Sequence, residues 1–252
     1  MHHKIIHNVQ YRGPEVYDDP EFSRQYHHKR QKVDNPNDAL EKPVIEALLG
    51  SVAGKTILDL GCGDGKFGRQ LLVEGAARYY GVDGSEQMVR LAEEQLSGQS
   101  AEVFRADLVH WPFPNLKFDT ILSRLVLHYL EDLRPLFQKV YDHLLPDGEF
   151  IFSVEHPILT SCYESYNNVP GKRGNWIVDN YFEDGLRENI WLDKKVIKYH
   201  RTLETYFRVC QDTGFRVESI RESRPQRSNF QLEENFVRRK RIPLFLFFKL
   251  SR

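Results

Sequence analysis

Short runs of apolar residues alternate along the chain with segments whose apolar residues recur at helical spacing. The first pattern is typical of strands buried on both faces, and the second is typical of amphipathic helices. The predicted strands are 56–60, 78–82, 101–105, 118–122, 149–154, 216–220 and 244–248. The predicted helices between them are 66–74, 86–95, 133–144 and 203–213, with a turn at Pro146-Asp147-Gly148 before the fifth strand. This alternation predicts an α/β fold built on a parallel sheet.

Two segments depart from this alternation. Residues 1–45 are polar and contain two predicted helices, which begin at Pro20 and Pro43, the first of them capped by Asp19. Residues 156–200 combine prolines, glycines and aromatic residues without a clear period. A stretch this long without regular structure is usually functional in a compact domain, so we expect an insertion that contributes to a binding site.

Composition narrows the class of protein. The 252 residues are 40% hydrophobic and 28% charged, and the formal net charge of −1 provides no general attraction to nucleic acid or to membranes. The cysteines Cys62, Cys162 and Cys210 lack the short paired spacing of disulfide frameworks and zinc sites. No apolar run approaches the roughly 18 residues of a membrane span. The sequence therefore predicts a cytoplasmic protein with no metal site. We expect a monomer or a homodimer, although nothing in the composition distinguishes the two.

A glycine-rich turn after the first predicted strand carries the strongest chemical signal. It reads L-D-L-G-C-G-D-G from Leu58 to Gly65, and the next strand ends at another acid, Asp83. Glycines let the backbone pass close to a ligand, and an acid at the end of the second strand can accept both hydroxyls of a ribose. The carboxylates of Asp59 and Asp64 would repel a pyrophosphate, so they favour a ligand with an ammonium or sulfonium group. The alternative is a Rossmann-type turn that holds no cofactor.

This run, together with Asp83, closely resembles the glycine-rich motif of class I S-adenosylmethionine-dependent methyltransferases, in particular their small-molecule (methyltransferase type 11/12-like) branch. The resemblance covers residues 55–155 with high specificity and 200–250 more loosely. It implies a Rossmann-like sheet of seven mostly parallel strands, the last one antiparallel, with helices on both faces. It also implies S-adenosylmethionine as the cofactor, which leaves as S-adenosylhomocysteine.

The matching positions imply where the cofactor binds. Asp83 would bind the ribose hydroxyls, Met88 would pack on the adenine, and Asp107 would reach the adenine amino group. The cofactor-binding residues implied in this way are Tyr26, Asp59, Gly61, Cys62, Gly63, Asp83, Gly84, Met88, Ala106, Asp107, Leu108 and Ser123.

The resemblance also divides the chain into four parts. Residues 1–45 would form a helical cap over the cofactor site, 46–155 the cofactor-binding core, 156–200 a substrate-side insertion or lid, and 201–252 the rest of the sheet. Tyr17 and Tyr26 resemble aromatic residues that cover the cofactor in related enzymes. Tyr26 would face the sulfonium, because a cation is attracted to an aromatic ring. The alternative for both tyrosines is ordinary packing of the first helix.

One sequence difference from other branches of the family bears on the identity of the methyl acceptor. Methyltransferases of nucleic acids and protein amides often carry an Asn/Asp-Pro-Pro-aromatic box after the fourth strand, where this chain has Ser123-Arg124-Leu125-Val126. A small molecule held under the 156–200 insertion therefore fits better than an exocyclic amine of a base. The candidate substrate-binding residues are Tyr17, Trp176, Tyr181 and Tyr199.

Three histidines are candidates for a general base. His128 follows the fourth strand, His156 follows the fifth, and His200 lies at the exit of the insertion. An imidazole suits this role because its ordinary pKa lies near neutral pH. The alternative for each is a structural or substrate-orienting histidine. Glu155 is either an orienting group or a solvated loop carboxylate.

The leading hypothesis is an enzyme that transfers a methyl group to O, N or C of a small molecule. A second hypothesis makes RNA the methyl acceptor, because residues 238–241 are a basic run, although a solvated loop is the better interpretation of that run. A third is a non-catalytic module that binds the cofactor or a partner.

Overall fold

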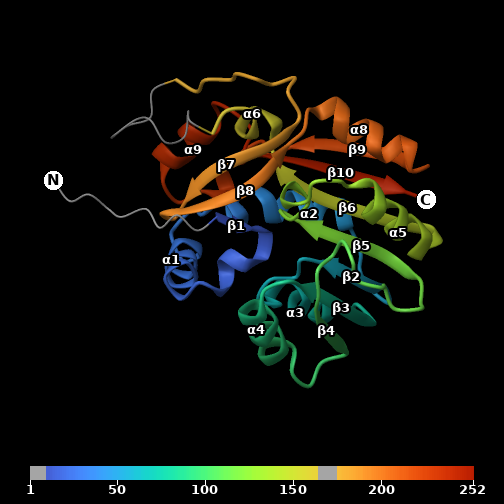
Figure 1. The fold of residues 1–252 in the computed structure, drawn as a ribbon. Coiled ribbons are helices and arrows are strands. Elements are labelled where there is room, and N and C mark those ends of the chain that lie inside the picture. The colour runs from blue at the N-terminus through green and yellow to red at the C-terminus, as the bar shows by residue number, and fades with distance from the viewer. Residues whose placement is uncertain (1–9, 164–174) are drawn as a thin grey trace.

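The computed structural model describes residues 10–163 and 175–252, so the first nine residues of the predicted cap and residues 164–174 of the predicted insertion lie outside the described part. Its main sheet has seven strands in the order β4-β3-β2-β5-β6-β10-β9 (Figure 1). The strands are β2 (Thr56–Leu60), β3 (Arg78–Asp83), β4 (Ala101–Arg105), β5 (Phe118–Arg124), β6 (Leu144–Glu155), β9 (Arg216–Glu222) and β10 (Phe245–Ser251).

Neighbouring strands from β2 to β6 run parallel, whereas β10 is antiparallel to both β6 and β9. This arrangement confirms the predicted Rossmann-like sheet with an antiparallel last strand. Parallel strands bring their carboxyl ends to one edge of a sheet, so the residues that follow β2, β3 and β5 meet there.

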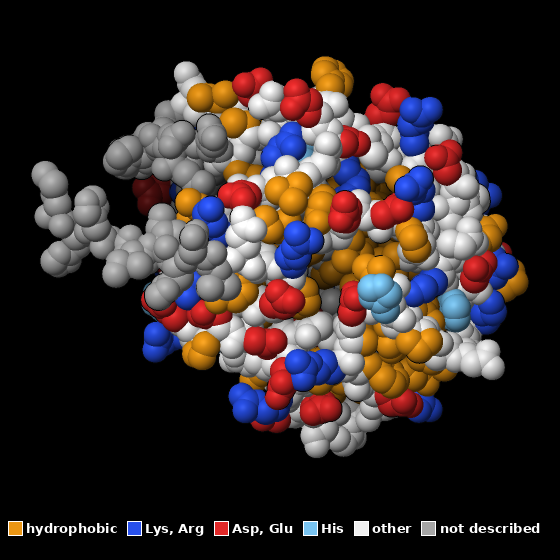
Figure 2. Space-filling model, in the orientation of Figure 1, with side chains coloured by type: hydrophobic (Ala, Val, Ile, Leu, Met, Phe, Trp, Pro, Cys, Tyr) orange, Lys and Arg blue, Asp and Glu red, His pale blue; other side chains and the backbone are white. Residues whose placement is uncertain are grey.

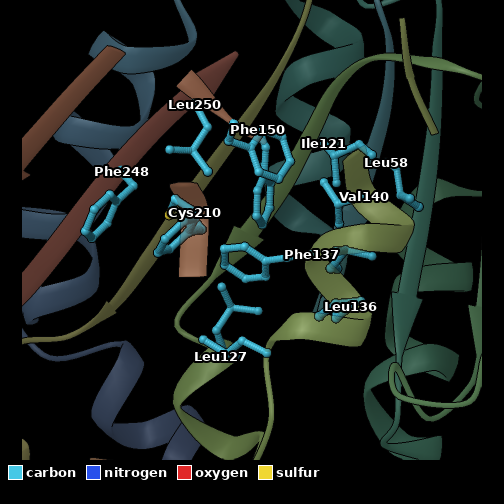
Figure 3. Packing of buried hydrophobic residues seen from close by; sticks show 14 of the residues in the cluster. Leu58, Ile121, Leu127, Leu136, Phe137, Val140, Phe150, Cys210, Phe248 and Leu250 are labelled. Atoms are coloured by element: carbon cyan, nitrogen blue, oxygen red, sulfur yellow. The ribbon is translucent and has the colours of Figure 1, made fainter. Parts of the chain in front are cut away.

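Helices cover both faces of this sheet. One face packs against α2 (Lys42–Leu49), α3 (Lys66–Val73) and α4 (Glu86–Leu96), and the other packs against α5 (Arg134–His143) and α8 (Leu203–Asp212). In α5 the apolar residues Leu136, Phe137 and Val140 recur at helical spacing, and all three are buried. Figure 3 shows Phe137 among Phe150 and other side chains from the strands. The apolar stripe of each helix therefore forms one half of a core layer.

A second, three-stranded sheet replaces most of the loop that the sequence predicts after the fifth strand. Its order is β1 (Gln10–Arg12), β8 (Lys194–His200) and β7 (Gly185–Trp191). The antiparallel hairpin of β7 and β8 turns at Leu192-Asp193, whose φ angles are 49° and 63°. The prediction of a loop-rich insertion was wrong for residues 185–200, because this tight turn lacks the usual glycine or asparagine.

Two consecutive aspartates, Asp18 and Asp19, attach the N-terminal segment to α4 and to the small sheet. The segment comprises η1 (Gly13–Asp18), α1 (Pro20–Arg30) and the turn η2 (Asn37–Glu41). Asp19 caps α1 by accepting from the Phe22 N–H at 2.9 Å, and it also binds Lys194 of β8 at 2.9 Å. Asp18 accepts from the Ser85 hydroxyl at 2.6 Å, at the start of α4. We call residues 13–41 the cap.

Two further sequence predictions need correction. Pro146-Asp147-Gly148 does not end the preceding helix as a free turn. It lies inside β6, where the pairing with β5 jumps from Leu144 to Glu149, so these residues form a bulge. The basic run at 238–241 is not all loop, because its first two residues close α9 (Glu233–Arg239). Cations there are favourable, since the helix dipole is negative at the C-terminus.

The remaining short elements are α6 (Pro157–Thr160), η3 (Leu127–Tyr129) and η4 (Arg227–Asn229). Among the helices of residues 10–163 and 175–252, none has the length and apolar character needed to cross a membrane.

Candidate active site

A cavity of about 1240 Å³ lies between the carboxyl ends of the parallel strands, the cap and the small sheet. The arrowheads of β5 and β6 point toward the side on which α1 and the small sheet lie (Figure 1). The molecule is hollowed on this face, where hydrophobic side chains line the recess and charged side chains surround it (Figure 2). Ligand pockets usually measure about 300–1,000 Å³, so this cavity can hold a nucleoside cofactor together with a second molecule.

The glycine loop forms one wall of the cavity. Gly61 has a φ of +84°, and a Cβ added there would lie 2.1 Å from the Val126 side chain, so neither the backbone angle nor the space admits another residue. Gly63 donates its N–H to Asp83 at 3.0 Å. The loop thus runs directly along the ligand space and is tied to the end of β3.

One of the two carboxylate oxygens of Asp59 receives no hydrogen bond. Its Oδ2 accepts from the Tyr79 hydroxyl at 2.8 Å, while its buried Oδ1 has no hydrogen-bond partner in the described part of the chain. Gly68 makes room for the Tyr79 ring, since a Cβ there would lie 2.3 Å from it. Burial raises the pKa of Asp59 to about 6. An unpartnered carboxylate oxygen on a residue of the cavity wall fits the ammonium group of the methionine moiety.

Asp83 is held by backbone groups with its carboxylate toward the cavity. Its Oδ1 accepts from the Ser85 N–H at 2.9 Å, and its Oδ2 accepts from Gly63. Burial raises the pKa of Asp83 against the opposing effect of these hydrogen bonds. Each carboxylate oxygen can accept a second hydrogen bond, so this geometry suits the two hydroxyls of a ribose.

The structure places eleven of the twelve predicted cofactor residues on the cavity wall. The exception is Ser123, which is fully buried and donates its hydroxyl to the Leu60 carbonyl at 3.2 Å. Its role in the structure is to join β5 to β2, so the expectation that it lines the site was wrong. The lining residues are Tyr26, Asp59, Gly61, Cys62, Gly63, Asp83, Gly84, Met88, Ala106, Asp107 and Leu108.

One part of the wall of this cavity contains a buried ion pair surrounded by aromatic rings. Lys198 is 1% exposed, and its Nζ lies 2.6 Å from Glu155 Oε1. The Tyr163 hydroxyl donates to Glu155 Oε2 at 2.5 Å. The Lys198 ammonium also lies over Trp191, 5.1 Å from the ring centroid. We call this the inner chamber, and define it by Tyr17, His128, Tyr129, Glu155, Tyr163, Trp191 and Lys198.

Glu155 remains ionised in this chamber. Burial alone would raise its pKa, but the Lys198 ammonium and the Tyr163 hydroxyl outweigh that effect and lower the pKa to about 2. The solvated loop carboxylate that the sequence left open is therefore not what the structure shows. A carboxylate this acidic is a poor proton acceptor and a good anchor.

Only one of the three candidate histidines lines the cavity. His128 is 2% exposed, and burial lowers its pKa to about 3. Its Nδ1 accepts from the Glu155 N–H at 3.4 Å, which leaves the proton of the neutral ring on Nε2. In this state His128 can donate a hydrogen bond from Nε2 and is not a base.

His156 and His200 have structural surroundings outside the cavity wall. His156 caps α6, where its Nδ1 accepts from the Ile158 N–H at 3.2 Å, and its Nε2 lies 3.0 Å from Glu222. His200 is fully buried, with Nδ1 2.6 Å from the Thr160 hydroxyl and Nε2 toward a backbone carbonyl. Neither position gives support for a catalytic role.

The four candidate substrate residues also differ in whether they line the cavity. Tyr17 and Tyr199 line the cavity, whereas Trp176 and Tyr181 do not. Trp176 donates its indole N–H to the Ile158 carbonyl at 3.1 Å. The Tyr181 hydroxyl accepts from a backbone N–H at 3.3 Å. The last two therefore hold the segment around them together.

Sequence reasoning missed several residues of the cavity wall. Lys198 lies in β8, where buried lysines occupy positions at which a strand pattern would show apolar residues. The missed lining residues are Glu41, Arg124, Tyr129, Tyr163, Asn189 and Lys198, whereas Trp191 was expected from the sequence as an aromatic wall of an acceptor pocket.

Known proteins share this architecture. A family described as a methyltransferase domain matches residues 57–148. The crystal structure of an S-adenosylmethionine-dependent methyltransferase from Mesorhizobium loti is similar with a TM-score of 0.76 and 35% identity, over 84% of this chain and 97% of that one. An uncharacterized protein of Haemophilus influenzae is 33% identical over 82% of this chain and 85% of its own length. Trans-aconitate 2-methyltransferase of an Azoarcus species is 30% identical over 66% of each chain.

The family match includes the glycine loop and Asp83, and the similarity to the Mesorhizobium loti structure extends over most of both chains. The chain belongs to the class I S-adenosylmethionine-dependent methyltransferases, and its cofactor is S-adenosylmethionine.

Proposed function

We propose that the protein methylates a small molecule bound in the inner chamber. The observation that carries this proposal is the Glu155–Lys198 pair, which lies among aromatic side chains behind the cap and the small sheet. A buried pair of opposite charges does not attract a polyanion, and single-stranded nucleic acids are usually held in open basic grooves. The similarity to a trans-aconitate 2-methyltransferase supports a small acceptor as well.

The chamber residues are suited to orienting an acceptor. When bound, the cofactor supplies an electrophilic methyl group, and alignment of the reacting atoms accounts for much of the acceleration in such a displacement. His128 and the tyrosine hydroxyls can donate hydrogen bonds, while Glu155 and Lys198 provide fixed charges. None of these groups is a strong base, so we expect an acceptor atom that is nucleophilic without first losing a proton.

Labelled methyl transfer tests the proposal. The protein is incubated with isotopically labelled S-adenosylmethionine and, in parallel, with a fractionated metabolite extract and with total RNA. We expect the label in a small-molecule product detected by mass spectrometry, and none from the Asp83→Asn variant. Label in the RNA fraction, or cofactor binding without turnover in any fraction, would contradict a small-molecule acceptor.

A further inference from the structure

Arg124 is the last residue of β5 and stands where other branches of the family carry the Asn/Asp-Pro-Pro box. Its side chain lines the same cavity as Asp59 and Tyr26. The arginine is close enough to Asp59 for its charge to lower the pKa of that carboxyl, against the larger effect of burial. The two residues therefore present opposite charges to one part of the cavity.

The guanidinium of Arg124 is fixed in one orientation. Its Nε and Nη2 donate to the two oxygens of Glu41, at 3.1 Å and 2.5 Å. Glu41 is itself fully buried and accepts from the Ser153 hydroxyl at 2.8 Å. The guanidinium also lies over the Phe67 ring, with Cζ 3.9 Å from the centroid. This packing restrains a side chain that would otherwise be flexible.

One edge of the guanidinium is not used by these contacts. Within residues 10–163 and 175–252, the hydrogen bonds of Arg124 involve Nε and Nη2, and none involves Nη1. Asp59 likewise keeps Oδ1 without a partner. A cationic donor and an anionic acceptor, both preoriented and both on the wall behind the glycine loop, complement a ligand group that carries a carboxylate and an ammonium together.

We propose that Arg124 binds the carboxylate of the cofactor's methionine moiety while Asp59 binds its ammonium, and that Glu41 is the residue that positions Arg124. The site would then recognise the amino-acid end of the cofactor as a zwitterion. This inference depends on the cofactor alone and is independent of which molecule receives the methyl group.

Calorimetric titration with three ligands tests the assignment without any turnover. The ligands are S-adenosylhomocysteine, its decarboxylated analogue and its deaminated analogue. For the natural protein we expect removal of either group to weaken binding by about tenfold to a hundredfold, as is usual for a hydrogen bond to a charged group.

The variants separate the two halves of the site. In Arg124→Met, S-adenosylhomocysteine and the decarboxylated analogue should bind within about threefold of each other, while removal of the amino group should still cost affinity. In Asp59→Asn, the pattern should reverse. Glu41→Gln should reduce the preference for the carboxylate only partly, because it loosens Arg124 without removing it.

Two other cations of the cavity wall serve as matched controls. Arg30 and Lys66 also line the cavity but pair with Asp38 and Asp64. Arg30→Met and Lys66→Met should keep the full preference for the carboxylate. Loss of that preference in either of them, or its retention in Arg124→Met, would overturn the assignment.

Arg124→Met leaves Glu41 without its cation, so its folding has to be checked by circular dichroism. The double variant Glu41→Gln/Arg124→Met removes both charges and keeps the test valid if the single variant unfolds. Equal affinity of the natural protein for S-adenosylhomocysteine and its decarboxylated analogue would also reject the proposal, with no variant needed.

Discussion

The ionisation of Asp59 shows how one residue in the site depends on its neighbours. Tyr79 holds one of its oxygens, and Gly68 leaves the space that the Tyr79 ring occupies. Burial raises the pKa of Asp59 to about 6, so in the empty protein the carboxyl begins to take up a proton just below neutral pH. A protonated carboxyl cannot attract an ammonium group.

The affinity for S-adenosylhomocysteine should therefore fall as the pH is lowered from 7 to 5. With a pKa of about 6, the ionised fraction of Asp59 decreases about tenfold over this range, and the association constant should follow it. Calorimetric titration at a series of pH values measures the effect. Adenosine lacks the ammonium group and should show a much flatter profile that also controls for Asp83, while Asp59→Asn should lose the dependence. A steep profile for adenosine would contradict the role of Asp59.

At the scale of secondary-structure elements, the turn of the β7–β8 hairpin has two residues that are uncommon at such positions. Leu192 and Asp193 both adopt positive φ angles, which cost free energy for residues other than glycine, although less for asparagine and aspartate than for leucine. Asp193 is exposed.

Asp193→Gly should stabilise the protein by about 0.5–1 kcal/mol, because glycine adopts the left-handed conformation without steric cost. Urea unfolding measures the change. Asp179→Gly is the matched control, since Asp179 is exposed as well and has no positive φ angle. It should give no gain, and an equal gain in both variants would show that the turn conformation is not the cause.

The same hairpin marks the limit of prediction from sequence. The seven strands of the main sheet could be placed to within a few residues of most of their ends, because parallel strands buried on both faces are continuous apolar runs. In β8, Lys194 and Lys198 point inward at positions where apolar residues are expected, so the strand pattern is hidden.

The cofactor side of the site could be predicted from the sequence, whereas the inner chamber could not. The cofactor side is a local motif, with a loop and an acid about twenty residues apart. The inner chamber gathers Tyr17, Tyr129, Glu155 and Lys198 from four distant parts of the chain, and no spacing in the sequence reports their contact. The missing glycine in the hairpin turn hid the element that brings Lys198 to Glu155.

At the scale of the whole molecule, the Glu155–Lys198 pair joins the main sheet to the small one. Glu155 ends β6 and Lys198 lies in β8, so the pair crosses the interface between two separately hydrogen-bonded layers. The low pKa of Glu155, about 2, means that its contribution to stability is fully present above the ordinary pKa near 4.5 and is lost only as the pH falls toward 2.

Lys198→Met should lower the free energy of unfolding by about 3–5 kcal/mol, because it leaves Glu155 buried without its cation. Glu155→Gln/Lys198→Met should recover much of this loss, as measured by urea unfolding near neutral pH. Lys195→Met serves as the control, since Lys195 pairs with Glu188 at the surface, and it should change stability by less than about 1 kcal/mol. A double variant as unstable as Lys198→Met would show that the loss comes from packing of the lysine stem.

The anchoring of the cap has a consequence for the order in which a new chain becomes functional. Asp19 and Lys194 are 175 positions apart, and β1 has no strand partner until β8 exists. A ribosome releases the glycine loop and Asp83 long before it releases residues 194–200, so a nascent chain first exposes a half-built nucleoside site without its cover. We expect the cofactor to be retained only late in synthesis, when β8 has emerged and Lys194 can hold the cap in place beside the site.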